Sequence, residues 1–382
     1  MARSCAWRLL AFTLAVASSP LPAQVPDWSL EAQGRLLGGP AADQGAALAE
    51  RRRLLDEGEA RLAAGDALAA QQSFDRASQL LHAADTELSL VRAYMQAGEY
   101  RRALAFGAHA AGAHREFPAG NALYAWLLQA GGQGRYAERL LAEAIEKAPD
   151  DPSLQAARAA LGSAAPRAEG VLATGPARVL PYAWGTQVAA GSRVVGSGTL
   201  AGAGDLALVP SALVNGALAI RVRNGLGQTV AARLVESNDD TALLKLERAL
   251  PRPPGLSRVG REPFAGSPGY CVEQVAGDGP EAAWPLLRSG FFAYPARDGG
   301  LRPLGIEAPP GPRGGPVFDA AGHLAGLALT ASDGRDRLLP VSAWPAQAMG
   351  DASGAAAPGA RLPLDELYER ALLLALQVIV LR

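Results

Sequence analysis

The loop Gly311-Pro312-Arg313-Gly314-Gly315-Pro316 is the part of the sequence whose residue types could build a catalytic site. Glycines let a backbone turn sharply and present amide hydrogens to a developing oxyanion, so Gly311, Gly314 and Gly315 form the frame of an oxyanion-binding loop. Arg313 stands inside this frame. A guanidinium stays protonated and is not a nucleophile, so the loop keeps a frame for acyl transfer but lacks an attacking group.

Short β-prone segments separated by glycine and proline precede this loop, and they predict an all-β barrel or sandwich. They cover residues 187–190, 192–195, 206–209, 218–222, 229–234 and 242–246. Further motifs follow in a fixed order along the chain. They are Arg288-Ser289-Gly290, Ile306-Glu307-Ala308 and, after the loop, residues 318–327.

Together these motifs resemble the trypsin-like serine peptidases of the bacterial high-temperature-requirement (Htr) class. The stretch 194–200 resembles the Gly-Ser-Gly strand that opens the peptidase domain. Residues 208–214 resemble Val-Thr-Asn-x-His-Val-Val, which places the catalytic histidine at Ala212. Residues 238–244 resemble Asp-Ile-Ala-Leu-Leu and place the triad aspartate at Asp240. The loop resembles Gly-x-Ser-Gly-Gly-Pro and places the nucleophilic serine at Arg313.

The resemblance covers roughly residues 179–344 and implies a double β-barrel with a cleft between the barrels. It also implies that hydrolysis has been lost, because the triad needs a hydroxyl, a histidine and an aspartate, and only the aspartate is present. The alternative is an active serine peptidase with a displaced nucleophile. No histidine partner can be placed for a substitute serine, and His323 lies in a turn beyond the loop. The candidate serines are Ser192, Ser211 and Ser289.

Two roles are open for Arg313. In the first, its guanidinium fills the space left by the missing histidine and pairs with Asp240, because that aspartate would otherwise be a buried, unpaired charge. In the second, Arg313 faces the cleft and binds a carboxylate such as a peptide C-terminus. The first role is favoured, and peptide binding in the inter-barrel cleft stays open.

Residues 52–161 read as helices that repeat along the chain. Turn signals at Gly65-Asp66, Gly98-Glu99-Tyr100 and Gly132-Gln133-Gly134 lie 33 and 34 residues apart. Alanines recur in the same register at Ala70, Ala103, Ala137, Ala77, Ala110 and Ala144. The pattern resembles tetratricopeptide repeats, although Glu57 and Gly107 depart from the signature. The alternative is a generic alanine-rich helical bundle.

Asp151-Pro152 predicts the N-terminus of a helix over residues 153–161 that caps the repeat stack. A repeat stack forms a concave groove, so the predicted partner is a protein or peptide held there. An envelope assembly factor acting through this groove alone is a further alternative. Of the four histidines, His82, His109 and His114 lie in the helical half. Their spacing indicates no shared metal face, and we interpret them as surface or groove residues; the sequence predicts no metal or cofactor.

The first residues predict a secretory signal peptide. Arg3 and Arg8 flank the short n-region, residues 9–16 are apolar but too short to span a bilayer, and Leu21-Pro22-Ala23 is a plausible cleavage site. An uncleaved anchor is the alternative. Cys5 would leave with the signal, so Cys271 would have no internal disulfide partner. A periplasmic protein of a Gram-negative bacterium is the expectation. The net charge of −1 gives no reason to expect binding to nucleic acid or an anionic membrane.

The C-terminal residues 363–382 combine a helix start with a β-branched strand end. They resemble the start of a peptidase domain, so we expect them to pack onto the barrel or to belong to a truncated duplicate. An exposed apolar patch for a partner is the alternative. The expected order is α-solenoid, then all-β double barrel. The predicted segments are a signal peptide (1–23), leader (24–51), repeats (52–161), linker (162–178), trypsin-like domain (179–345), spacer (346–362) and apolar segment (363–382).

Overall fold

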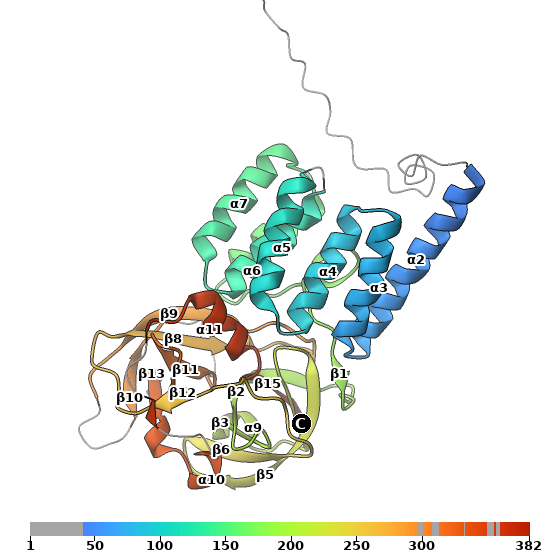
Figure 1. Cartoon of the computed structure of the whole chain (residues 1–382). Helices are drawn as coiled ribbons and strands as arrows, with labels where there is room; N and C mark the ends of the chain where they lie inside the picture. The colour runs from blue at the N-terminus through green and yellow to red at the C-terminus, as the bar shows by residue number, and fades with distance from the viewer. Residues whose placement is uncertain are drawn as a thin grey trace, which may run out of the picture.

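The computed structural model describes residues 41–115, 117–295, 301–307, 313–331, 333–349, 355–356 and 360–382. The predicted signal peptide lies outside these residues. An array of antiparallel helices stands on two β-barrels (Figure 1). The helices are α2 (Ala41–Ala63), α3 (Ala67–Leu80), α4 (Ala84–Gln96), α5 (Tyr100–Ala113), α6 (Pro118–Ala130), α7 (Gly134–Lys147) and α8 (Pro152–Leu161). The helical region begins at Ala41, inside the stretch predicted as a leader.

The predicted repeat turns are confirmed. Gly65, Gly98 and Gly132 have φ angles of +84°, +83° and +80°, a region that side-chain-bearing residues rarely adopt. Each turn separates the two helices of one pair, and the recurring alanines of all three pairs are buried between them. The capping helix is also confirmed, because the Asp151 carboxylate accepts hydrogen bonds from the amides of Ser153 and Leu154 at the start of α8.

Six antiparallel strands form the first barrel. They are β2 (Arg193–Ala201), β3 (Leu206–Pro210), β4 (Ala219–Arg223), β5 (Gln228–Ser237), β6 (Thr241–Leu246) and β15 (Ala375–Leu381). Their order is β5-β4-β15-β2-β3-β6, and pairing of β5 with β6 closes the ring. The short strand β1 (Trp184–Gly185) adds to β5 in parallel. The predicted strand at 187–190 is not formed.

Strand β15 comes from the end of the chain and lies in the middle of this sheet. It pairs antiparallel with β2 on one side and with β4 on the other. Its residues from Ala375 to Val380 are all buried. Residues 363–382 are therefore an integral part of the first barrel, and the trypsin-like domain does not end at residue 345. Helix α11 (Leu364–Ala371) precedes this strand.

The second barrel is also a closed ring of six strands. They are β8 (Pro268–Glu273), β9 (Leu286–Phe292), β10 (Arg302–Gly305), β11 (Pro316–Asp319), β12 (Leu324–Thr330) and β13 (Asp336–Pro340). The order is β11-β8-β9-β10-β13-β12, closed by β11 with β12, and the short strands β7 (Arg258–Val259) and β14 (Ala355–Ala356) extend it beyond β12. The predicted double β-barrel is confirmed. Four further short helices lie in the described residues: η1 (Gly170–Ala173), α9 (Ser211–Val214), η2 (Val341–Ala343) and α10 (Ala346–Met349).

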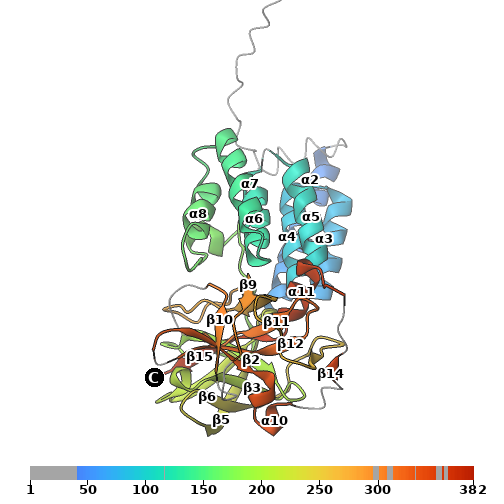
Figure 2. The same ribbon diagram turned by 90° about the vertical axis from the view of Figure 1, so that its left-hand side faces the viewer.

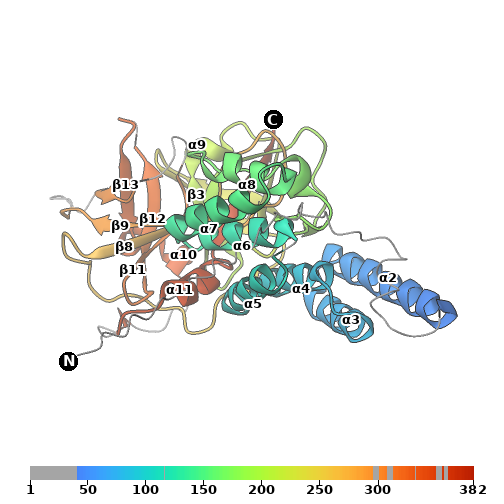
Figure 3. The same ribbon diagram turned by 90° about the horizontal axis from the view of Figure 1, so that it is seen from above.

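The repeat turns and α11 dock the helices onto the barrels (Figure 2). A Cβ atom on Gly65 would lie 2.2 Å from the Trp184 ring, and one on Gly132 would lie 2.7 Å from Leu287. Tyr368 of α11 stacks edge-on against Tyr100 at 4.5 Å between ring centroids. One cluster of buried hydrophobic residues runs from the repeats into the barrels. Seen from above, α2 and α3 extend past the edge of the barrels (Figure 3).

In the part of the chain that the structure describes, every helix is too short or too polar to cross a bilayer.

Candidate functional site

The structure brings together the segments that carry the three positions assigned by the motifs to a catalytic triad. Ala212 lies in α9 (Ser211–Val214), the short helix after β3, and Asp240 directly precedes β6. The Ser211 amide donates to the Asp240 carbonyl at 3.1 Å, so these two segments touch. The segment of residues 313–315, called here the arginine loop, packs against β2 of the same barrel, since the Thr199 hydroxyl donates to the Gly314 carbonyl at 3.1 Å.

Gly314 is required at its position by space as well as by conformation. Its φ is +155°, and a Cβ atom there would lie 1.8 Å from the Ser197 carbonyl oxygen and 2.9 Å from Pro210. Because Pro210 directly precedes α9, this contact places the arginine loop beside the helix that carries Ala212. Gly311, the first glycine of the predicted frame, lies outside the described residues.

Arg313 is buried and forms two ion pairs inside the second barrel. Its side chain is 2% exposed, its Nε lies 2.9 Å from the Glu273 carboxylate, and its Nη1 lies 3.1 Å from Asp336 Oδ2. The predicted pair with Asp240 is therefore wrong. Its premise also fails, because Asp240 is exposed and needs no buried counter-ion. The cleft-facing role for Arg313 is wrong as well, since its guanidinium is directed at these two carboxylates.

Glu273, at the end of β8, is the central residue of this cluster. Its Oε1 accepts from Arg313 Nε at 3.1 Å and from the amides of Gly314 and Gly315 at 3.3 Å each. Two amides of the predicted oxyanion frame are thus directed at a carboxylate of the protein itself. The sequence analysis did not identify Glu273 or Asp336, because nothing in their local sequence distinguishes them from other strand residues.

Burial and charge together shift the pKa values of Arg313 and Cys271. Burial alone would lower the pKa of the Arg313 guanidinium, but attraction to the Glu273 and Asp336 carboxylates outweighs burial and raises it. Burial, reinforced by the Glu273 carboxylate, raises the pKa of the Cys271 thiol well above its usual range. Arg313 is therefore a fixed cation, and Cys271 is held as an unreactive thiol.

Ser211 and His323, two of the residues considered as substitutes, have other partners. The Ser211 hydroxyl donates to the Asp239 carbonyl at 2.9 Å. His323 lies in the turn between β11 and β12, where its Nδ1 is 3.1 Å from Asp319 Oδ2. These contacts serve the local turns in which the residues lie.

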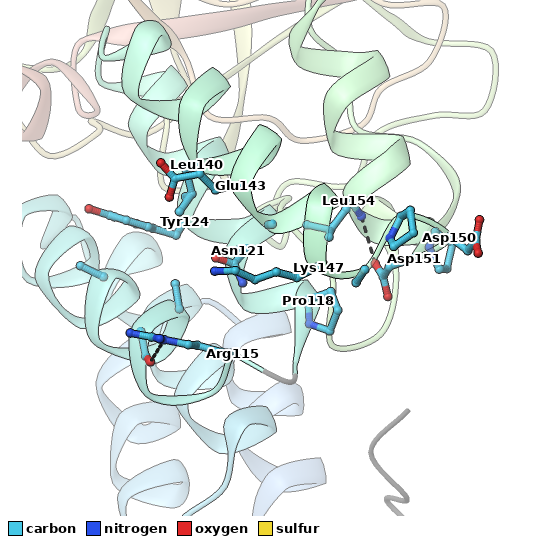
Figure 4. Close-up of a pocket in the computed structure, with 17 residues that line it drawn as sticks. Arg115, Pro118, Asn121, Tyr124, Leu140, Glu143, Lys147, Asp150, Asp151 and Leu154 are labelled. Carbon is cyan, nitrogen blue, oxygen red and sulfur yellow. Dashed lines mark hydrogen bonds between the residues drawn. The ribbon is translucent and has the colours of Figure 1, made fainter. Parts of the chain in front are cut away.

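The second candidate site is a cavity of about 980 Å³ in the repeat array, formed by α5, α6, α7 and the start of α8. Figure 4 shows Arg115, Asn121, Tyr124 and Lys147 around this opening. Its apolar lining includes Ala111, Leu140, Ala144 and Leu154. The sequence predicted a groove in the repeats but none of these residues. The carboxylates of Glu143, Asp150 and Asp151 also line it. The cavity therefore offers apolar contact area and side chains of both charges, which suits an extended peptide or a helix.

Residues 94–161 match the family model of the tetratricopeptide repeat. This part of the helical half is thus similar to tetratricopeptide repeats, as its alanine and glycine register predicted. No curated protein matches the chain at a significant level.

Solved structures similar to the chain include the HtrA-type protease AlgW with a decapeptide, which is 23% identical with a TM-score of 0.29. That match covers 39% of this chain and 48% of the other. A serine endoprotease from Yersinia pestis is 19% identical with a TM-score of 0.30, and the match covers 38% of this chain and 53% of the other. The chain spans about half the length of the solved structures that it matches.

Proposed function

We propose that this is an exported bacterial protein whose tetratricopeptide-repeat groove binds a protein partner and whose trypsin-like domain is catalytically inactive and serves as a scaffold. The observation that carries the proposal is the burial of Arg313, at the position assigned to the nucleophile, in ion pairs with Glu273 and Asp336. Export and a periplasmic location rest on the signal-like residues 1–23.

Inactivity follows from the chemistry of acyl transfer. That reaction needs a nucleophile, a base to take its proton and donors for the oxyanion. The Ala212 methyl group cannot accept a proton, and Arg313 offers no nucleophile. The Gly314 and Gly315 amides are engaged by Glu273, at 3.3 Å each. All three requirements therefore fail around the same loop.

A scaffolding role is supported by the way in which the barrels hold the repeats. Arg101 of α5 pairs with Glu369 of α11 at 3.0 Å, and the Tyr368 hydroxyl donates to the Pro285 carbonyl at 2.7 Å. Tyr182 connects the barrels to two repeat helices, because its amide donates to Gln96 and its hydroxyl to Glu59. The groove is consequently presented in a fixed orientation.

Inactivity predicts that a serine-directed fluorophosphonate leaves the purified protein unlabelled, since Arg313 stands at the nucleophile position and Ala212 at the base position. Trypsin treated in parallel verifies the probe. The variant Ala212→His/Arg313→Ser/Glu273→Gln restores two triad groups and removes the carboxylate that Arg313 neutralised, and we expect it to show labelling above the native background. Labelling of the native protein at Ser211 or Ser289, located by mass spectrometry, would instead establish the active peptidase with a displaced nucleophile.

Peptide binding in the repeat groove is tested with a displayed peptide library selected against the full chain. For the selected peptides, we expect Arg115→Ala/Lys147→Ala to weaken affinity at least about tenfold, because each lost charge-assisted hydrogen bond costs about 1.5–3 kcal/mol. Arg158→Ala is the matched control, since Arg158 bonds to Gln155 on the exposed side of α8. Selected peptides whose affinity is the same for both variants would contradict the assignment of the groove.

A further inference from the structure

Three histidines from different parts of the repeat array converge on one buried carboxylate. Glu87 lies in the first turn of α4, and its side chain is 1% exposed. Its Oε1 lies 2.6 Å from His82 Nε2 and 3.3 Å from His109 Nε2, and its Oε2 lies 3.4 Å from His114 Nε2. The sequence analysis interpreted these histidines as surface or groove residues without a shared metal face, whereas the structure places all three around Glu87.

The fold explains how distant positions meet. His82 lies in the connection between α3 and α4, whereas His109 is in the last turns of α5 and His114 directly follows that helix. Because α4 and α5 pack antiparallel, the end of α5 returns to the level at which α4 starts. This level lies at the end of the array opposite the turns that dock on the barrels (Figure 1). Sequence spacing within one helix could not reveal such a juxtaposition.

The burial of Glu87 calls for a positive charge. Among the described residues, neither of its oxygens accepts a conventional hydrogen bond, so the three ring nitrogens are its close polar neighbours. A buried carboxylate is costly unless it is paired with a cation. A metal ion between the imidazoles and the carboxylate would supply that charge.

We propose that His82, Glu87 and His114 bind a divalent transition-metal ion of the zinc class. The ligand atoms of these three residues lie within 4.8 Å of one another, close enough for small side-chain movements to bring them around one ion. Imidazole nitrogen and carboxylate oxygen are ligands that zinc accepts, and three protein ligands with a fourth position filled by water or a further side chain is a common arrangement. His109 contacts Glu87 but is not one of the three residues whose ligand atoms lie within 4.8 Å of one another, so we assign the fourth position to water.

The exposure of the ligands makes the site reversible in solution. His82 and His109 are each 58% exposed, whereas His114 is 18% exposed and Glu87 is buried. An ion would therefore enter from the surface and settle on the buried carboxylate. It would link the α3–α4 connection to the end of α5 and the residues that follow it. Ala111, Gly112 and Arg115 of this region line the groove. The metal thus stabilises the repeat array next to the peptide-binding cavity.

The test is a zinc titration of the untagged protein after chelation and dialysis, in competition with a chromogenic chelator. We expect one zinc ion per chain. His82→Ala and His114→Ala should each weaken zinc affinity at least about tenfold, and His109→Ala less. His323→Ala is the matched control, because it removes the fourth histidine of the chain from a turn of the second barrel. Cobalt substitution should give the intense visible absorption of a tetrahedral site in the native protein and not in His114→Ala.

Folding does not confound the result, because His82 lies at the surface and its replacement leaves the core intact. Circular dichroism of each variant verifies this. If the native protein binds no zinc, or if His82→Ala and His114→Ala bind it as tightly as the native chain, the proposal is overturned.

Discussion

Deletion of residues 363–382 is expected to prevent the first barrel from folding. Strand β15 occupies the centre of the sheet, so its loss would remove ladder hydrogen bonds to both β2 and β4. Its residues Leu376, Val378 and Val380 are at most 1% exposed, and burial of each such side chain is worth about 1.5–3 kcal/mol. Their sum is comparable to the about 5–15 kcal/mol by which whole domains are stable. Near-ultraviolet circular dichroism and limited proteolysis should show a disordered barrel.

A point substitution separates this effect from the length of the chain. Val378→Asp places a charge inside the barrel and should destabilise it severely. Arg382→Ala is the matched control at the end of the same strand, where the guanidinium donates to the Leu213 carbonyl at 3.0 Å, and we expect a small effect. Adding a synthetic peptide of residues 363–382 should restore protease resistance to the deleted chain. A truncated protein with native spectra and native protease resistance would show that β15 is dispensable.

The role of β15 illustrates which parts of this fold a sequence can and cannot reveal. Its β-branched residues indicated a strand, and the segment resembled the opening strand of a peptidase domain. Its position between β2 and β4 depends on partners more than 150 residues away, about which local pattern carries no information. The repeats were predictable because Gly65, Gly98 and the recurring alanines specify contacts between neighbouring helices.

The candidate site was likewise predictable from the sequence only in part. The ordered motifs correctly indicated that the segments carrying Ala212, Asp240 and Arg313 meet. The partner of Arg313 was wrong, because the choice among acidic residues depends on burial. Asp240 is exposed, whereas Glu273 lies 40 residues from Arg313 on a strand whose inward face is visible only in the folded barrel. The histidines around Glu87 were missed for the same reason, since two connections and a helix pair bring them together.

The second large effect is expected from Arg313→Met, which should lower the free energy of unfolding of the second barrel by about 3–5 kcal/mol. The substitution replaces the charged side chain with an apolar one of similar length. It leaves the Glu273 carboxylate, which is only 10% exposed, without its cation. Thermal and urea denaturation followed by tryptophan fluorescence measure the change. The double variant Arg313→Met/Glu273→Leu should recover most of the loss, because the pair is then replaced by apolar groups.

Asp336→Asn provides the matched control for this prediction. Asp336 is 29% exposed, so its ion pair with Arg313 is partly screened by solvent and should contribute only about 1 kcal/mol or less. If Asp336→Asn lowered the free energy of unfolding more than Arg313→Met, the main stabilising ion pair would be the one with Asp336 and not the one with Glu273. That result would contradict the prediction. If instead Arg313→Met is strongly destabilising, the charge at position 313 is part of the barrel core. A serine at this position would then be disfavoured by folding, because it would leave the Glu273 carboxylate without its cation.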